Sequence, residues 1–208
     1  MDRRTLLGRA ALGVGGMVAL AGCGGTQEEQ PPEDPTPTPT PTPPSEPPDE
    51  PPEVPDNFDR VVDVTDRGAD PTADSSLAPI LDDIEAEGTM IFLPPGRYRM
   101  NRSWNVENFE RTGIVGYGAT IVPDPETDAH LLAPISREDC RELRIEGLTF
   151  DYTHPEASGR MVHAEVRDGL TVRDVTARGT VYRRPTLVRV DVTDPDGHGL
   201  VERLALPN

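Results

Sequence analysis

The residues best suited to chemistry lie close together near the C-terminus, in the sequence DPDGHG at 194–199. Carboxylates and an imidazole at such short spacing are the groups that general acid–base catalysis uses. The same residues are typical of an ordinary turn, in which Asp bonds its own backbone and Gly adopts positive φ. Asp194, Asp196 and His198 are therefore the catalytic candidates, and a purely structural turn is the alternative.

Side chains that could bind a sugar are spread along the chain. The rings of Trp104, Tyr152 and Tyr182 could stack on sugar faces, although aromatic residues also pack in cores. Arg183 and Arg184 could hold a carboxylated sugar, because a guanidinium group binds a carboxylate through two parallel hydrogen bonds. Solvated surface arginines are the alternative. Asp194 and Asp196 could contribute to a calcium site, but too few further oxygen ligands lie near them in the sequence. We therefore assign no metal site and keep calcium as the cofactor only of a lyase.

The first 23 residues have the organisation of an export signal. Arg3 and Arg4 resemble the twin-arginine motif, and the sequence LAGC at 20–23 resembles a lipobox, in which Cys23 carries the lipid. The apolar run before it covers about 12 residues, too short for a bilayer core that needs about 20. We therefore expect export by the twin-arginine route and a lipid anchor on the outer face of the cell membrane. An ordinary cleaved signal and an uncleaved anchor are the alternatives.

Residues 24–56 form a linker with 13 prolines and little that could build a core. A proline-rich chain is extended by about 3.1 Å per residue, so this segment suits a disordered spacer between a membrane and a domain. The remaining residues, 57–208, are enough for one core of ordinary size. We therefore divide the chain into a signal at 1–23, a linker at 24–56 and one folded domain.

The charge of the chain is strongly negative. All 20 basic residues are arginines, and the 37 acidic residues bring the net charge to −17. Without a basic patch the chain has no means to neutralise phosphates, which argues against a nucleic-acid partner. Concentrated salt screens such self-repulsion, so the composition is typical of a halophile's protein. An ordinary acidic secreted protein is the alternative.

The start of the folded domain predicts one helix followed by strands. Apolar residues recur at helical spacing, and a preceding serine and Gly88 mark the ends of a helix at about 76–87. The β-rich sequences at 89–93 and 97–100 flank a Pro-Pro-Gly turn and predict two strands. After them no helix is predicted.

Strand-like segments then repeat. The apolar pattern of residues 143–150 returns 27 residues later at 170–177, and rougher copies lie at 114–121 and 200–206. A second series contains Leu131, Met161 and Leu187. Several strands in each period suit a parallel solenoid, in which each coil buries its inward side chains against the next coil. A β-sandwich with coincidental spacing is the alternative.

Three motifs in the first part of the domain resemble a known superfamily. They are GADPTADS at 68–75, LPPGRY at 93–98 and VGYGA at 115–119, with a helix between the first two. Together they are similar to the N-terminal region of the pectin-lyase-like right-handed β-helix proteins, which include pectate lyases, polygalacturonases and phage tailspikes. The resemblance implies an all-β fold, a right-handed parallel β-helix with the helix at 76–87 capping its first coil.

The resemblance also implies carbohydrate chemistry. A lyase of this superfamily needs a base and a cation, often calcium, and a hydrolase needs two carboxylates. The trio at 197–199 resembles the Gly-His-Gly of polygalacturonases, but their Asn-x-Asp and Asp-Asp motifs do not occur on the repeated strand segments before it, and their Arg-x-Lys cannot occur in a chain without Lys. We therefore predict a module that binds polysaccharide; a lyase or hydrolase acting on acidic glycans is the alternative.

Only three or four coils fit between the expected cap and residue 208, fewer than such enzymes usually have. The last copy of the repeat runs to the terminus without a capping element, which would leave strand edges unpaired. We therefore expect a truncated solenoid. It would complete itself by self-association through the last coil, or be a non-catalytic remnant of a longer enzyme.

Overall fold

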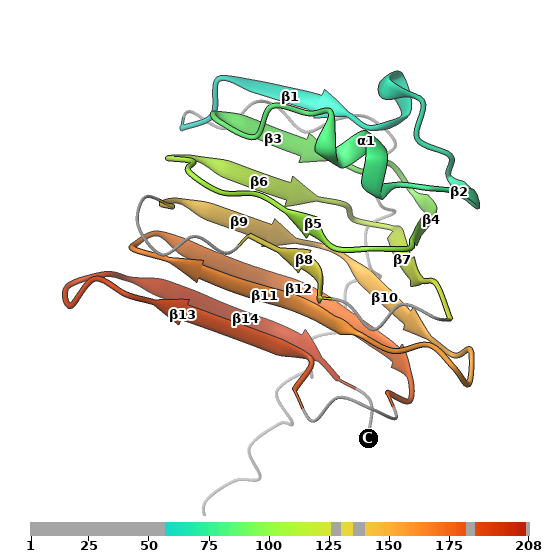
Figure 1. Cartoon of the computed structure of the whole chain (residues 1–208). Coiled ribbons are helices and arrows are strands. Elements are labelled where there is room, and N and C mark those ends of the chain that lie inside the picture. The colour runs from blue at the N-terminus through green and yellow to red at the C-terminus, as the bar shows by residue number, and fades with distance from the viewer. Residues whose placement is uncertain (1–56, 126–129, 135–139, 182–185, 207–208) are drawn as a thin grey trace, which may run out of the picture. The chain divides into compact units, whose positions relative to one another are not determined.

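The computed structural model describes residues 57–125, 130–134, 140–181 and 186–206, and these residues form a parallel β-solenoid (Figure 1). The signal at 1–23 and the linker at 24–56 lie outside the described residues. In the part of the chain that the structure describes, no helix has the length and apolar character needed to cross a membrane.

The solenoid is built from short strands with almost no helix. The helical elements are η1 (Thr65–Arg67) and α1 (Ala78–Asp82). The strands are β1 (Arg60–Asp63), β2 (Thr72–Ser76), β3 (Thr89–Phe92), β4 (Gly96–Met100), β5 (Trp104–Asn105), β6 (Thr112–Val115), β7 (Ala119–Pro123), β8 (His130–Ala133), β9 (Leu143–Glu146), β10 (Thr149–Tyr152), β11 (Arg160–Val166), β12 (Leu170–Gly179), β13 (Val188–Val192) and β14 (Gly199–Ala205).

Each coil contributes strands to three parallel ladders. The first ladder is β1-β3-β6-β9-β12-β14, and the second is β2-β4-β7-β10-β12. They form one sheet because the long β12 bends and pairs with both β9 and β10. The third ladder, β5-β8-β11-β13, is a separate sheet. Figure 1 shows this third ladder in front of the first, with the strands of the two running in opposite directions.

The core is a set of columns in which equivalent residues of successive coils stack. One column crosses the whole first ladder and is entirely β-branched, which suits residues packed on a pleated surface. Its members are Val62, Ile91, Ile114, Ile145, Val172 and Val201. The four inner members are completely buried, whereas Val201 in the last described coil is 43% exposed.

The predicted repeat is confirmed where two coils have the same length. The pairing of Arg144 with Thr171 and of Thr149 with Thr176 gives the predicted 27-residue interval. For the rougher copies, the pairing that the sequence predicts is shifted from the observed register. Leu200 pairs with Thr171 instead of occupying the core, because a shift of one residue moves a side chain to the other face of a strand.

The helix at the N-terminal end is shorter than the sequence predicts. It covers Ala78–Asp82 instead of 76–87, and the polar residues before it form the strand β2, which the sequence did not predict. Consecutive acids after Leu81 oppose the negative C-terminal end of a helix, which accounts for the early end. Its apolar side does what the sequence predicts, because Leu77 and Leu81 are buried in the main core.

One corner of the solenoid has the same backbone conformation in successive coils. Between the first and second ladders the chain adopts positive φ in four coils, at Gly118, Gly147, Asp174 and Arg203. A Cβ added to Gly147 would lie only 2.7 Å from the ring of Tyr117, which is too close. The positive φ of Gly147 also disfavours other residues, so glycine suits this position for two reasons. The corner thus bends the sheet without interrupting its ladders.

Candidate functional site

A groove of about 670 Å³ lies on the outer face of the first ladder, over β9, β12 and β14. It crosses three successive coils and is lined mainly by polar and charged side chains. The charged lining residues are Glu142, Arg144, Glu146, Asp168 and Arg173, with His198 beside them. We refer to it as the charged groove.

The floor of the charged groove is an ion network between neighbouring coils. Glu146, whose side chain is only 4% exposed, lies 2.6 Å from the Nε of Arg144 and 2.6 Å from the Nε of Arg173. Burying a carboxylate is costly unless cations pair with it, and two arginines do so here. The hydrogen bond that Arg173 donates to Glu146 raises the pKa of Arg173, so this guanidinium stays charged. Glu146 therefore positions two half-buried cations with further N–H donors along the groove.

The end of the charged groove is built by the turns that enter β12 and β14. Asp168 accepts hydrogen bonds from the backbone N–H groups of His198 (2.7 Å) and Gly169 (2.9 Å). The bond from His198, together with the one from Gly169, holds the pKa of Asp168 below its ordinary value. A fixed carboxylate acceptor thus stands at one end of a groove whose floor carries donors.

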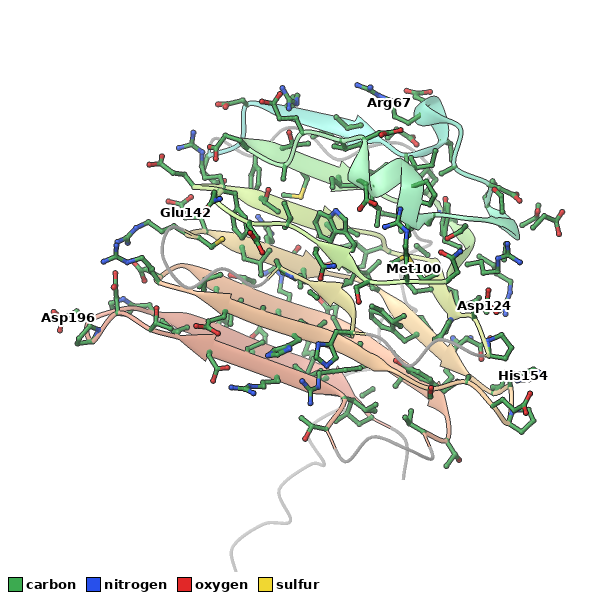
Figure 2. The ribbon with its side chains drawn as sticks, viewed as in Figure 1. Arg67, Met100, Asp124, Glu142, His154 and Asp196 are labelled. Atoms are coloured by element: carbon green, nitrogen blue, oxygen red, sulfur yellow. The ribbon has the colours of Figure 1, made fainter. Side chains whose placement is uncertain are left out.

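The sequence-predicted catalytic residues are neighbours that do not converge. Asp194 is held by Arg141 and Arg167, each at 3.0 Å, and its backbone carbonyl closes the turn. Figure 2 shows Asp196 at the tip of this turn, pointing away from the strands. The side chain of His198 is 91% exposed; its Nδ1 lies 3.8 Å from Asp168, and its backbone N–H donates to the same carboxylate. The predicted turn is present between β13 and β14.

The predicted sugar-binding aromatic residues divide into two groups. Trp104 and Tyr152 are each only 1% exposed, so neither ring presents a face to a ligand. Trp104 stacks in the core column of the third ladder, and burial raises the pKa of Tyr152. Tyr182, Arg183, Arg184 and the lipidation residue Cys23 lie outside the described residues.

A pair of histidines lies on the third ladder. The Nδ1 atoms of His130 and His163 are 3.0 Å apart, and the rings meet edge to face with centroids 4.6 Å apart. Burial, with Arg160 and Arg189 nearby, lowers the pKa of His163, which favours a neutral ring that shares its hydrogen with its neighbour. His154 lies between β10 and β11, at the opposite side of the molecule from Asp196 (Figure 2).

Acids at the ends of strands perform a recurring structural task that the sequence reasoning missed. Asp63, Asp70 and Asp151 each accept two hydrogen bonds from the threonine two residues later, one from its backbone N–H and one from its hydroxyl at 2.6 Å. The spacing Asp-x-Thr is the signal that could have identified them, because Asp readily bonds the backbone two residues on. Each of these acids therefore uses one carboxylate oxygen to fix the local backbone.

The corner near the charged groove is stabilised across several coils. Tyr117 donates a hydrogen bond to Asp174 at 3.2 Å, and Asp174 binds Arg203 of the next coil through two bonds of 2.6 and 2.8 Å. The two bonds from Arg203 account for the lowered pKa of Asp174. Since a bidentate pair fixes the geometry of both partners, this chain of contacts holds β14 in place.

A second hollow, of about 400 Å³, lies beside α1 and β5. Two of the acids that line it form ion pairs: Asp82 pairs with Arg102, and Glu85 lies 3.0 Å from Arg60. In the described ranges no group of three or more His, Cys, Asp or Glu side chains is arranged to hold a metal ion.

The comparisons with known proteins add no relative: no family model, no curated protein and no solved structure matches this chain. The architecture therefore defines the class. The chain contains a parallel β-solenoid that carries a charged groove on one face and a helical element at its N-terminal end.

Proposed function

We propose that the chain is an exported, lipid-anchored β-solenoid module that binds polysaccharide in the charged groove. The observation that carries this proposal is the ion network of Arg144, Glu146 and Arg173, which lines a groove across successive coils. A solenoid offers an extended surface suited to a linear ligand. The groove runs over three coils, so it can contact several units of a polymer.

The mixture of charges in the groove favours a sugar over other ligands. Sugar hydroxyls both donate and accept hydrogen bonds, and the groove supplies arginine donors beside the fixed acceptor Asp168. A nucleic acid would require a surplus of cations, whereas the carboxylates of this groove outnumber its arginines. Within this acidic groove, the N–H groups of Arg144 and Arg173 that do not contact Glu146 are the positions at which the carboxylate of a sugar unit would bind.

A pair of matched substitutions on β12 tests the groove. Thr171 lines it, whereas Thr176 is at an outward position of the same strand on the second ladder. Thr171→Trp fills the groove and should weaken binding of polygalacturonate at least about tenfold, or about 1.4 kcal/mol, in calorimetric titration. Thr176→Trp should leave binding unchanged. Equal affinity of the two variants and the parent would contradict the proposal.

The same preparations separate binding from catalysis. The full chain is incubated with polygalacturonate, with and without calcium, and unsaturated or reducing products are measured. Binding without product is the expected result. Release of unsaturated product would favour the lyase alternative, and new reducing ends would favour a hydrolase.

The location of the protein has its own test. Cys23→Ser removes the proposed lipid attachment site, so the protein should move from the membrane fraction to the medium. Replacing Arg3 and Arg4 with lysines should stop export and leave the precursor inside the cell. A membrane-bound Cys23→Ser protein would favour the uncleaved anchor instead.

A further inference from the structure

The last described coil has open strand edges. β13 pairs with β11 and β14 pairs with β12, and neither has a partner on its other side among the described residues. Figure 1 shows both strands at the same end of the solenoid. The apolar side chains here are exposed by 46% at Leu200, 43% at Val201 and 47% at Leu206. Such an edge is a template for pairing with another strand.

The hydrogen bonds to β11 show which groups of β13 are free to pair. Thr193 donates its N–H to Val166, and the carbonyl of Leu187 accepts from Val162. Odd-numbered residues of β13 therefore face β11, because backbone groups alternate sides along a strand. Val188, Val190 and Val192 turn their N–H and C=O groups to the open edge.

These free groups fit a second copy of β13 that runs antiparallel. In a register centred on Val190, each Val190 exchanges two hydrogen bonds with its symmetry mate. Val188 of one copy pairs with Val192 of the other in the same way. Every outward-turned N–H and C=O of the strand thus has a partner in an isologous, two-fold arrangement.

The charges of β13 select this register. Arg189 and Asp191 form an ion pair within each copy at 2.9 Å. In the centred register Arg189 of one copy also stands opposite Asp191 of the other, at the closely spaced positions between hydrogen-bonded pairs. A shift of the partner by two residues in one direction places Arg189 opposite itself, and in the other direction places Asp191 opposite itself. Opposed like charges destabilise strand pairing, so only the centred register is complementary.

β14, in the other sheet, offers a second edge that can pair in the same antiparallel way. His198 directs its carbonyl to β12, so Gly199 and Val201 face the open edge. In the preceding coil Thr176 donates to Leu148 above it, and the shared register then turns Leu204 to the open edge. An antiparallel pair centred between Glu202 and Arg203 sets Val201 opposite Leu204 and acid opposite base.

We propose that two copies of this chain associate tail to tail through β13 and β14, about a two-fold axis perpendicular to the solenoid. The pairing joins both edges of the last coil and brings Val201 and Leu204 of the two copies into one continuous core. An isologous contact closes on itself and produces a dimer, not a fibre. The two charged grooves then lie on one assembly.

Charge reversal on β13 tests this dimer. The full chain with Cys23→Ser, which cannot be lipidated, is studied by sedimentation equilibrium at about 0.15 M salt, where the screening length is about 8 Å. The parent should be a dimer. Asp191→Arg sets arginines opposite each other twice and should raise the dimer dissociation constant by at least about tenfold. The double variant Arg189→Asp/Asp191→Arg restores complementary pairs and should restore the dimer.

A control separates this interface from a general effect of charge. Glu165 lies beside Asp191 in the same column but one coil inside, so Glu165→Arg should leave the dimer intact. Circular dichroism verifies that each variant is folded. A monomeric parent would overturn the proposal. So would a dimer that Asp191→Arg does not weaken, or one that the charge swap does not restore.

Discussion

The two ends of the solenoid differ in how far their apolar side chains and strand edges are covered. At the N-terminal end α1 lies at the first coils, and Leu77, Leu81 and Ile84 are buried with the core. At the other end the inward residue Val201 is almost half exposed, and β13 and β14 have open edges. Among the described residues both ends have strands with an unpaired edge, β1 and β2 at one end and β13 and β14 at the other. At the N-terminal end, however, α1 packs against β5 of the third ladder, whereas no described element packs on the outer edge of β13. The comparison teaches that stability is concentrated at one end and the capacity to associate at the other.

The largest expected effect concerns the covered end. Leu81→Ala leaves a cavity beneath α1 and should lower the free energy of unfolding by about 2–5 kcal/mol. The matched substitution at the open end, Leu200→Ala, removes an exposed side chain and should change it by no more than about 0.5 kcal/mol. Urea denaturation measures both. Similar losses for the two variants would mean that the ends do not differ in packing.

The next largest effect is expected at the corner between the first and second ladders. Gly147→Ala combines positive φ with a clash against the ring of Tyr117. Gly68→Ala has the same unfavourable φ, but no atom lies within 4 Å of its added Cβ. Gly147→Ala should therefore cost more than the about 1–2 kcal/mol expected for Gly68→Ala. Equal losses in urea denaturation would show that Tyr117 does not restrict this corner.

Acid should weaken the corners in the middle of the molecule. Hydrogen bonds lower the pKa of Asp70, Asp168 and Asp174, and those from Thr153 and Arg97 outweigh burial to lower that of Asp151. A lowered pKa in the folded state adds stability above the unfolded value of about 3.9, and this stability is lost as the pH falls through the folded value.

The melting temperature of the protein should therefore fall as the pH is lowered from about 5 to about 2. The variant Asp174→Asn lacks the bidentate partner of Arg203, so it should lose less melting temperature over that range than the parent. An unchanged pH dependence in this variant would exclude Asp174 as a contributor. A melting temperature that rises toward acid would contradict the whole assignment.

The smallest effect is expected on the second ladder. Arg97 and Asp151 form an ion pair at 2.8 Å across two coils, but the Arg97 side chain is 53% exposed. Arg97→Ala should therefore change the free energy of unfolding by less than about 1 kcal/mol. A larger loss would show that this pair holds the coils together and that stability is less concentrated at the capped end.

The sequence predicted the repeating core better than the surface, and the reason is physical. Inward positions must be apolar in every coil, so Ile145 and Val172 show their spacing directly. The predicted pairing register is wrong where the corners of two coils differ in length. For example, Ile114 pairs with Ile145, two residues beyond Leu143, which the repeat predicted as its partner. Periodicity counts residues along the chain, whereas the pairing of strands ignores the loops between them.

The charged groove could not be predicted in the same way. Arg144, Glu146 and Arg173 occupy outward positions, which carry no apolar pattern, and they meet only because their coils stack. The strand β2 was not predicted for a related reason. Its sequence is polar, and pairing with β4 rather than its own strand propensity holds it in place. The Asp-x-Thr spacing could have predicted turns at these corners, but not which coils they connect.

The most direct test of the account is whether adjacent coils pair in the register that the structure shows. Thr149 and Thr176 are paired on adjacent strands, at the approximately 4.8 Å spacing that a disulfide can bridge. In the Cys23→Ser chain, Thr149→Cys/Thr176→Cys should form an intramolecular disulfide on mild oxidation. The out-of-register pair Thr149→Cys/Thr171→Cys should stay reduced. The opposite result, or no disulfide in either protein, would contradict the stacked parallel coils on which the groove and the dimer depend.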